Sequence, residues 1–168
     1  LNYGIRISEF SLLGKTPFYR YSSYNLADSA KSIIDSTSRI ISFIRPEPRI
    51  SLTYVFNDKN SVKASYTRNV QYLHLLSNST IGNPTDLWMP SSNNTIPESS
   101  DQYALGYYRN FNDNNYEFSA EAYYKNMFHQ VDYINGAILT FNANVESQLI
   151  YGKGRAYGIE LILKKKYG

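Results

Sequence analysis

The feature that most restricts the fold of this chain is a period-two alternation of apolar and polar residues. Between Arg49 and Phe56, and again between Tyr116 and Lys125, apolar side chains fall at every second position. Successive side chains of a strand point to opposite faces of a sheet, so this alternation predicts β-strands with one apolar and one polar face. The predicted strands cover residues near 1–11, 43–56, 61–77, 100–111, 116–134 and 154–166.

The connections between these segments alternate strictly between short and long. Residues 57–60 and 112–115 are compact runs of Asn and Asp, which tolerate the left-handed backbone of tight turns. Residues 12–42, 78–99 and 135–152 are long and rich in Ser, Asn, Thr, Gly and Pro. Short periplasmic turns and long extracellular loops are typical of outer-membrane barrels. We therefore predict an all-β fold, an antiparallel transmembrane β-barrel segment of about six strands that forms part of a larger barrel.

Composition favours a barrel over its main alternative, a soluble β-sandwich. The 168 residues include 17 tyrosines, and the mean hydropathy is only −0.44. Tyrosine suits a half-wet surface, because its ring packs against apolar groups while its hydroxyl stays hydrated. A sandwich would also alternate, but its strands cluster near 5–6 residues, and several runs here are longer.

Several other classes of protein are excluded or disfavoured. The chain has no cysteine, so it holds no disulfide, thiolate metal site or cysteine nucleophile. The net charge of +3 is mild and the basic residues are scattered apart from 164–166, which argues against a nucleic-acid partner. The chain begins without Met and already in alternation, so we expect residues 1–168 to be a single partial barrel domain.

One segment of the first long connection has two interpretations. After a possible N-cap at Asn25, apolar residues fall at helical spacing, which predicts a short helix. The β-branched residues nearby instead favour the upper part of a hairpin. The residues concerned are Leu26, Ala30, Ile33, Ile34 and Thr37 for the helix, and Ile33, Ile40 and Ile41 for the hairpin.

Five segments give the chain a family resemblance. They are residues 48–54, 61–68, 71–76, 88–107 (through its parts 88–91, 96–98 and 101–107) and 152–160. Across most of residues 43–163 their order and spacing resemble the barrel of TonB-dependent outer-membrane receptors, and most closely the Bacteroidetes branch of that family.

This resemblance implies a barrel of 22 strands, of which six are present here, in the bacterial cell outer membrane. It implies energised nutrient uptake, with outer-membrane lipid, a plug domain of the same parent chain, the TonB complex and a small ligand of unknown identity as partners. We expect neither the plug nor the TonB box within these residues. The alternatives are a plugless porin or an envelope-assembly barrel.

The charged residues of the polar face are candidates for the lumen of the barrel. They could line a ligand path or hold a plug, although a wet interior also accepts charges and cross-strand ion pairs without any such role. The predicted lumen-facing residues are Arg49, Lys63, Glu117, Glu121, Lys125 and Glu160.

Trp88, the one tryptophan, is the tentative ligand-binding residue of the long connections. Its ring could stack on a sugar or an aromatic ligand. It could equally anchor at the membrane interface or pack the loop on itself, because Trp is enriched in both settings.

Catalysis and metal binding have little support. A serine hydrolase, the alternative from another functional class, would need His74 or His129 beside a buried acid and a serine, and no spaced motif indicates this. His129 and Asp132 are three apart, which places them on opposite faces of a strand. We predict no enzyme activity, no catalytic residue, no metal site and no cofactor.

Overall fold

A computed structural model describes residues 1–13, 18–20, 31–33, 39–76, 87–137 and 145–166 of the chain. Most of these residues lie in strands, and a single turn of 3₁₀ helix, η1, precedes the last strand. The elements are β1 (Asn2–Leu13), β2 (Phe18–Arg20), β3 (Lys31–Ile33), β4 (Arg39–Asn57), β5 (Asn60–Gln71), β6 (Leu73–Leu76), β7 (Leu87–Pro90), β8 (Glu98–Phe111), β9 (Tyr116–Tyr133), η1 (Val145–Gln148) and β10 (Leu149–Lys165). In these ranges no helix is long and apolar enough to cross a membrane.

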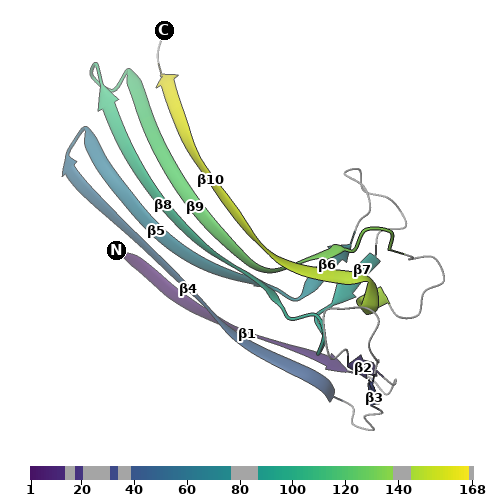
Figure 1. Ribbon diagram of the computed structural model, residues 1–168. Helices are drawn as coiled ribbons and strands as arrows, with labels where there is room; N and C mark the ends of the chain where they lie inside the picture. The colour runs from purple at the N-terminus through teal and green to yellow at the C-terminus, as the bar shows by residue number, and fades with distance from the viewer. Residues whose placement is uncertain (14–17, 21–30, 34–38, 77–86, 138–144, 167–168) are drawn as a thin grey trace.

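The six long strands form one curved antiparallel sheet in the order β1-β4-β5-β8-β9-β10 (Figure 1). Each long strand pairs with the next long strand along the chain, so the sheet is a simple meander. The predicted all-β fold with six antiparallel strands is confirmed, and the strand boundaries agree to within a few residues in most places.

The two short connections are tight turns at one end of the sheet, which we call the turn end. Asn112, Asp113 and Asn114 have φ values of 52°, 50° and 66°. This left-handed backbone is the reason Asn and Asp are favoured there. In the other turn, the side chain of Asn57 accepts hydrogen bonds from the Lys59 backbone N–H and the Asn60 amide.

The opposite end, which we call the loop end, carries two small hairpins, β2–β3 and β6–β7 (Figure 1). The prediction of one strand over 61–77 is wrong in its last part. β5 ends at Gln71, and residues 73–76 pair with β7 outside the main sheet. The alternation changes phase at this break, because Tyr72 and Leu73 are both apolar and Leu73 and Leu75 fall at positions that are polar along β5.

In the first long connection, Ile33 lies in β3 and pairs with Phe18 of β2. This pairing favours the hairpin interpretation at that position. Leu26, Ala30, Ile34 and Thr37, which carried the helical spacing, lie outside the described residues.

The strand register sorts side chains into two faces, because directly paired residues share a face. One continuous row contains Ile50 and five tyrosines, one residue from each long strand. Towards the turn end, the next rows on this apolar face contain Leu52, Leu105 and Ile159, then Tyr54 and Leu161. The row itself is Tyr3, Ile50, Tyr66, Tyr103, Tyr124 and Tyr157.

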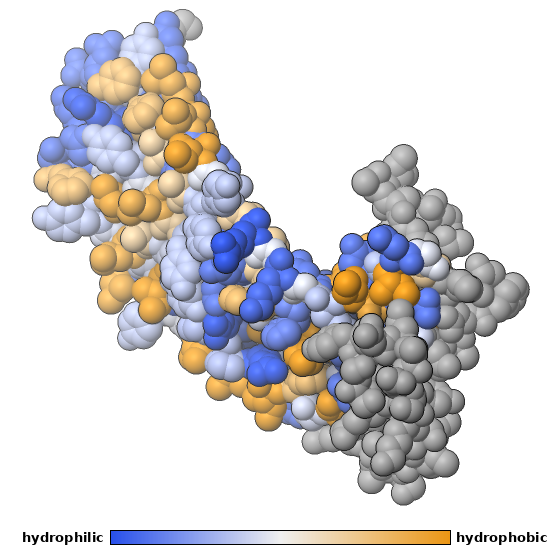
Figure 2. All heavy atoms as spheres, viewed as in Figure 1, coloured by the Kyte–Doolittle hydropathy of each residue, from blue (hydrophilic) through white to orange (hydrophobic). Residues whose placement is uncertain are grey.

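The apolar face is largely uncovered. Its side chains form what we call the apolar belt, and orange side chains line the lower left outline of the sheet in Figure 2. A soluble fold buries large apolar side chains, whereas a barrel wall turns them towards lipid. Exposed members of the belt include Tyr3, Ile5, Ile7, Ile50, Leu52, Tyr54, Tyr103, Leu105, Tyr124, Tyr157, Ile159, Leu161 and Leu163.

The buried apolar core of the described residues is small and lies at the loop end. It consists of Leu76, Met89 and Leu149, which come from β6, β7 and β10. Val131, Tyr133, Val145 and Tyr151 pack around it. This core attaches the β6–β7 hairpin to the ends of β9 and β10.

Candidate functional site

The strand register places all six predicted lumen residues on the polar face. Lys63, Glu121 and Glu160 share one row, in which Gly106 separates Lys63 from Glu121. Arg49 and Lys125 share a row two steps further towards the loop end on the same face, with Thr67 and Gln102 between them. Glu117 lies nearer the turn end, between Asn110 and Lys164.

Two of these six side chains have polar partners. Glu121 accepts a hydrogen bond from the Tyr108 hydroxyl at 2.9 Å, and Glu117 lies 3.3 Å from the Lys166 ammonium. The remaining four make no hydrogen bond or ion pair with other described residues. Arg49, Lys63 and Glu160 are exposed, and Lys125 is half-buried. Of these six residues, three cations and one anion are therefore uncompensated by other described residues.

Tyrosine rings cover glycines on the same face. A Cβ added to Gly106 would lie 2.8 Å from the Tyr108 hydroxyl, and one added to Gly158 would lie 2.9 Å from the Tyr123 ring. The rings can lie flat on the sheet only because these positions have no side chain.

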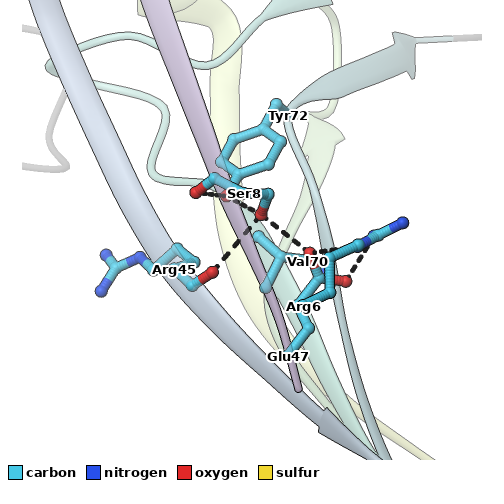
Figure 3. Close-up of polar contacts among 6 residues, drawn as sticks. All are labelled: Arg6, Ser8, Arg45, Glu47, Val70 and Tyr72. Atoms are coloured by element: carbon cyan, nitrogen blue, oxygen red, sulfur yellow. Dashed lines mark hydrogen bonds and ion pairs between the residues drawn. The ribbon is translucent and has the colours of Figure 1, made fainter. Parts of the chain in front are cut away.

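A polar network around Glu47 lies nearer the loop end of this face, and sequence reasoning did not identify it as a site (Figure 3). Glu47 is fully buried and receives both the Nε and Nη2 donors of Arg6. Its carboxylate also accepts from the Ser8 hydroxyl at 2.8 Å and from the Val70 backbone N–H at 3.4 Å. One carboxylate thereby joins β1, β4 and β5.

Tyr72 extends the network at the point where the chain leaves the main sheet. Its hydroxyl lies 2.7 Å from that of Ser8, and its ring stacks on Phe10 with centroids 5.3 Å apart. Ser8 lies on the polar face with Arg6 and Glu47. The junction between β5 and β6 therefore turns towards the polar face.

A second polar network holds the β6–β7 hairpin. The Nε2 atom of His74 lies 2.9 Å from the Ser91 hydroxyl. Its Nδ1 atom lies 3.3 Å from Glu98 Oε1, within ion-pair distance but outside hydrogen-bond geometry. The Glu98 carboxylate also accepts from the Val131 backbone N–H and the Gln130 side chain.

The environment of Glu98 determines its protonation. Glu98 lies three residues beyond Asp101 towards the loop end, outside the apolar belt. Partial burial alone would raise its pKa, but the His74 ring and the Val131 and Gln130 donors outweigh burial and hold the pKa below its ordinary value. The carboxylate is therefore charged at neutral pH.

Ser91 contacts His74, and His74 in turn contacts Glu98, which is the series of contacts found in a hydrolase triad. No motif in the sequence indicated this arrangement. A triad serine must reach the carbonyl of a substrate. Ser91 is 0% exposed and His74 is 2% exposed, so neither meets that requirement. Their contacts instead tie the hairpin to β8 and β9, and the geometry does not support the hydrolase alternative.

Residues 92–95, which follow β7, are held by side chains of η1 and β10. Glu146 of η1 accepts hydrogen bonds from the Ser92 hydroxyl and the Asn94 side chain, both at 2.5 Å. The Thr95 hydroxyl lies 2.9 Å from that of Tyr151 in β10. Residues 92–95 are thus packed against η1 and the start of β10.

Trp88 lies in β7, directly opposite Leu75 of β6. Its side chain is 63% exposed, and Leu73 and Leu75 are also about half exposed. These residues form the uncovered side of the hairpin, whereas His74 and Met89 form its buried side. Most of the Trp88 side chain is therefore uncovered, which argues against the interpretation that it packs the loop on itself.

Metal binding has no site among the described residues, where no group of three His, Cys, Asp or Glu side chains could hold an ion. His129 has a φ of 57° beside the register shift between β9 and β10, and both His129 and Asp132 are exposed.

Comparison with known proteins gives one match. Neither a curated protein nor a solved structure matches the chain. The family model described as "TonB dependent receptor-like, beta-barrel" matches residues 13–168, which includes all of the sheet except most of β1. That family consists of outer-membrane receptors and transporters rather than enzymes. The chain belongs to the TonB-dependent receptor-like β-barrel family.

Proposed function

We propose that this chain supplies part of the wall and of the extracellular surface of a bacterial outer-membrane receptor that imports a nutrient by TonB-dependent transport. The observation that carries the proposal is the two-faced sheet of a receptor-barrel family, with one exposed apolar face and one charged face. The loop end is the extracellular end and the turn end is periplasmic, as short turns and long loops indicate. The five segments that resemble the family favour a receptor of the Bacteroidetes type.

The polar face is the lumen wall in this proposal. Arg49, Lys63, Lys125 and Glu160 have no polar partner among the described residues, so their charges are available to a plug domain of the parent chain or to a passing ligand. A charged group in a wet lumen keeps much of its hydration, whereas the same group facing lipid would lose it.

Trp88 is the proposed ligand contact at the extracellular mouth. Its exposed ring, with Leu73 and Leu75 beside it, offers an apolar platform on which a sugar ring or an aromatic group could stack. Interface anchoring is the competing role. The β6–β7 hairpin turns towards the polar face at Tyr72, and this direction favours the ligand role over contact with the surrounding lipid.

Uptake in living cells tests the transport function. Cells with and without the intact receptor, and cells lacking TonB, are given labelled iron chelates, oligosaccharides, peptides and vitamins in turn. Receptor function predicts that accumulation of one probe class is lost in both deletion strains. Uptake that needs the protein but persists without TonB would contradict the proposal and indicate a porin.

The Trp88→Ala variant then tests the ligand contact with the probe identified. Loss of one stacking surface is expected to weaken binding about tenfold, whereas Trp88→Phe should remain close to wild type. Unchanged affinity of the Trp88→Ala variant would assign the ring to another role.

The absence of cysteine allows a direct test of the two faces. Single substitutions Arg49→Cys and Lys63→Cys should react with a hydrophilic thiol reagent in the folded protein once the plug is displaced. Leu52→Cys and Leu105→Cys, which lie on the apolar face, should stay unreactive in the membrane. Equal labelling of both pairs would overturn the lumen assignment.

A further inference from the structure

Two basic side chains lie unpaired on the apolar face, directly beyond the tyrosine row. Arg155 follows Tyr157 towards the loop end on the same face of β10, and Lys153 follows Arg155. Both are exposed, and neither makes a hydrogen bond or ion pair with other described residues. Their cross-strand partners on β9, Asn126 and Phe128, carry no charge.

The nearest acidic group in the register does not neutralise them. Asp101 pairs with Asn126, the neighbour of Arg155, but its carboxylate is already held by Arg68 at 2.7 Å and by the Tyr66 hydroxyl at 2.8 Å. The Arg68–Asp101 pair is neutral as a whole. Two positive charges therefore remain on the β9–β10 side of the sheet.

The surface on the turn-end side of these two charges is an apolar stretch of the belt. Tyr157, Ile159, Leu161 and Leu163 are 77%, 75%, 68% and 65% exposed along the same face of β10. A surface of this kind in an outer-membrane family is in contact with lipid acyl chains. On β10 the charges thus lie directly beyond the end of this apolar stretch, beside tyrosines of the kind enriched at membrane interfaces, where lipid headgroups are in reach.

We propose that Arg155 and Lys153, with Asn126 beside them, bind the phosphate group of an anionic lipid in the leaflet at the loop end. A guanidinium donates two parallel hydrogen bonds to a phosphate, and an ammonium adds a point charge. The acyl chains of the same lipid lie along Tyr157, Ile159 and Leu161. The inference rests on the membrane position of the sheet and does not depend on TonB-driven import.

The test measures lipid binding by the intact receptor in a neutral detergent, by native mass spectrometry. The probes are a doubly phosphorylated, acylated glucosamine disaccharide, the same lipid without its phosphates, and inorganic phosphate. The wild type should bind the phosphorylated lipid about 25-fold more tightly than the dephosphorylated lipid, at roughly fivefold for each of the two charges. Inorganic phosphate should compete only at far higher concentration, because it lacks acyl chains.

The double variant Arg155→Gln/Lys153→Gln should bind the phosphorylated lipid about 25-fold more weakly, at roughly fivefold for each charge. Its affinity for the dephosphorylated lipid should not change. Arg49→Gln/Lys63→Gln is the matched control, since it removes one Arg and one Lys from the opposite face and should bind like the wild type. The exchanged pair Arg155→Lys/Lys153→Arg keeps both charges and should retain most of the affinity.

Three results would overturn the proposal. The first is equal binding of the phosphorylated and dephosphorylated lipids, which would leave contact with acyl chains alone. The second is wild-type affinity in the double variant or, if that variant does not fold, in an Arg155→Gln single variant. The third is competition by inorganic phosphate at the concentration of the lipid, which would indicate a free-anion site. Each outcome leaves the uptake experiment unaffected.

Discussion

At the scale of the residue, the cost of a substitution depends on the face that the register assigns to it. Leu105 shares a row with Leu52 and Ile159 on the apolar face. Ser119 shares a row with Ser61 and Tyr108 on the polar face. The same charged side chain would meet lipid at one position and water at the other.

Replacing Leu105 with Arg should therefore destabilise the folded receptor by about 2–4 kcal/mol, the range for a basic residue near the bilayer midplane. Ser119→Arg, the matched change on the polar face, should cost clearly less. Guanidinium unfolding of both variants in lipid vesicles measures the difference. Equal losses would contradict the assignment of the two faces.

Glu47 is a buried residue whose contacts stabilise the fold. Replacing it with Ala would remove the carboxylate that accepts from the Val70 N–H and the Ser8 hydroxyl, and would leave Arg6 without its counter-charge. The free energy of unfolding should fall by about 1–3 kcal/mol, as for other buried groups left unsatisfied. Glu160→Ala removes an exposed carboxylate from the same face and should stay within about 0.5 kcal/mol of wild type. Similar losses in both variants would contradict the role of the network.

At the scale of the element, the β6–β7 hairpin is attached to the sheet by a small apolar core and by the contacts of Glu98. Leu76, Met89 and Leu149 supply the core, and Glu98 reaches both His74 and the backbone of β9. An element held by few buried contacts should open more readily than the six-stranded sheet. Local opening of the hairpin can therefore be measured separately from global unfolding.

Hydrogen exchange at the Val131 amide, which donates to Glu98, should be about tenfold faster in the Glu98→Gln variant at pH 7. Amides at the turn end should exchange at the wild-type rate. Unaltered protection of Val131 would show that the charge of Glu98 does not hold the hairpin.

The same attachment should depend on pH. Because the pKa of Glu98 is lower in the folded protein than its ordinary value of 4.5, the charged carboxylate stabilises the fold fully above pH 4.5. That stabilisation is lost as the pH falls through the lowered pKa. The protection of Val131, corrected for intrinsic exchange, should therefore decrease in this acid range in the wild type and stay flatter in Glu98→Gln. Parallel curves for the two proteins would contradict this assignment.

At the scale of the whole molecule, the sheet of the described residues has two edges, since β1 pairs only with β4 and β10 only with β9 (Figure 1). Unpaired backbone N–H and C=O groups cost several kcal/mol each in hydrocarbon, so a wall in lipid must be closed by further strands. The curvature of the sheet fits such a closed barrel.

Residues 1–168 expressed alone should consequently not insert stably into outer membranes. The measurement is resistance to protease and the shift in electrophoretic mobility on heating, with the intact receptor as the positive control. A folded, protease-resistant product of this chain alone would contradict the larger barrel.

Sequence alone determined the fold class, the six strands and the face of each charged candidate. These properties follow from local rules. A strand exposes alternate residues to alternate faces, so Glu121 and Lys125 had to share a face, and the Asn- and Asp-rich runs at 57–60 and 112–115 had to be turns. A one-residue shift in register would have moved the whole apolar belt to the other face, which is why the pattern is so informative.

Only the tertiary structure decided which distant residues meet. Nothing in the alternation showed that Arg6, Ser8 and Val70 would enclose the carboxylate of Glu47. His74, Ser91 and Glu98 come together because β5 ends at Gln71 and the chain pairs with β7 instead. The physical reason is that side-chain period reports the face of a strand, whereas burial and hydrogen-bond partners depend on cross-strand register and on where each strand leaves the sheet.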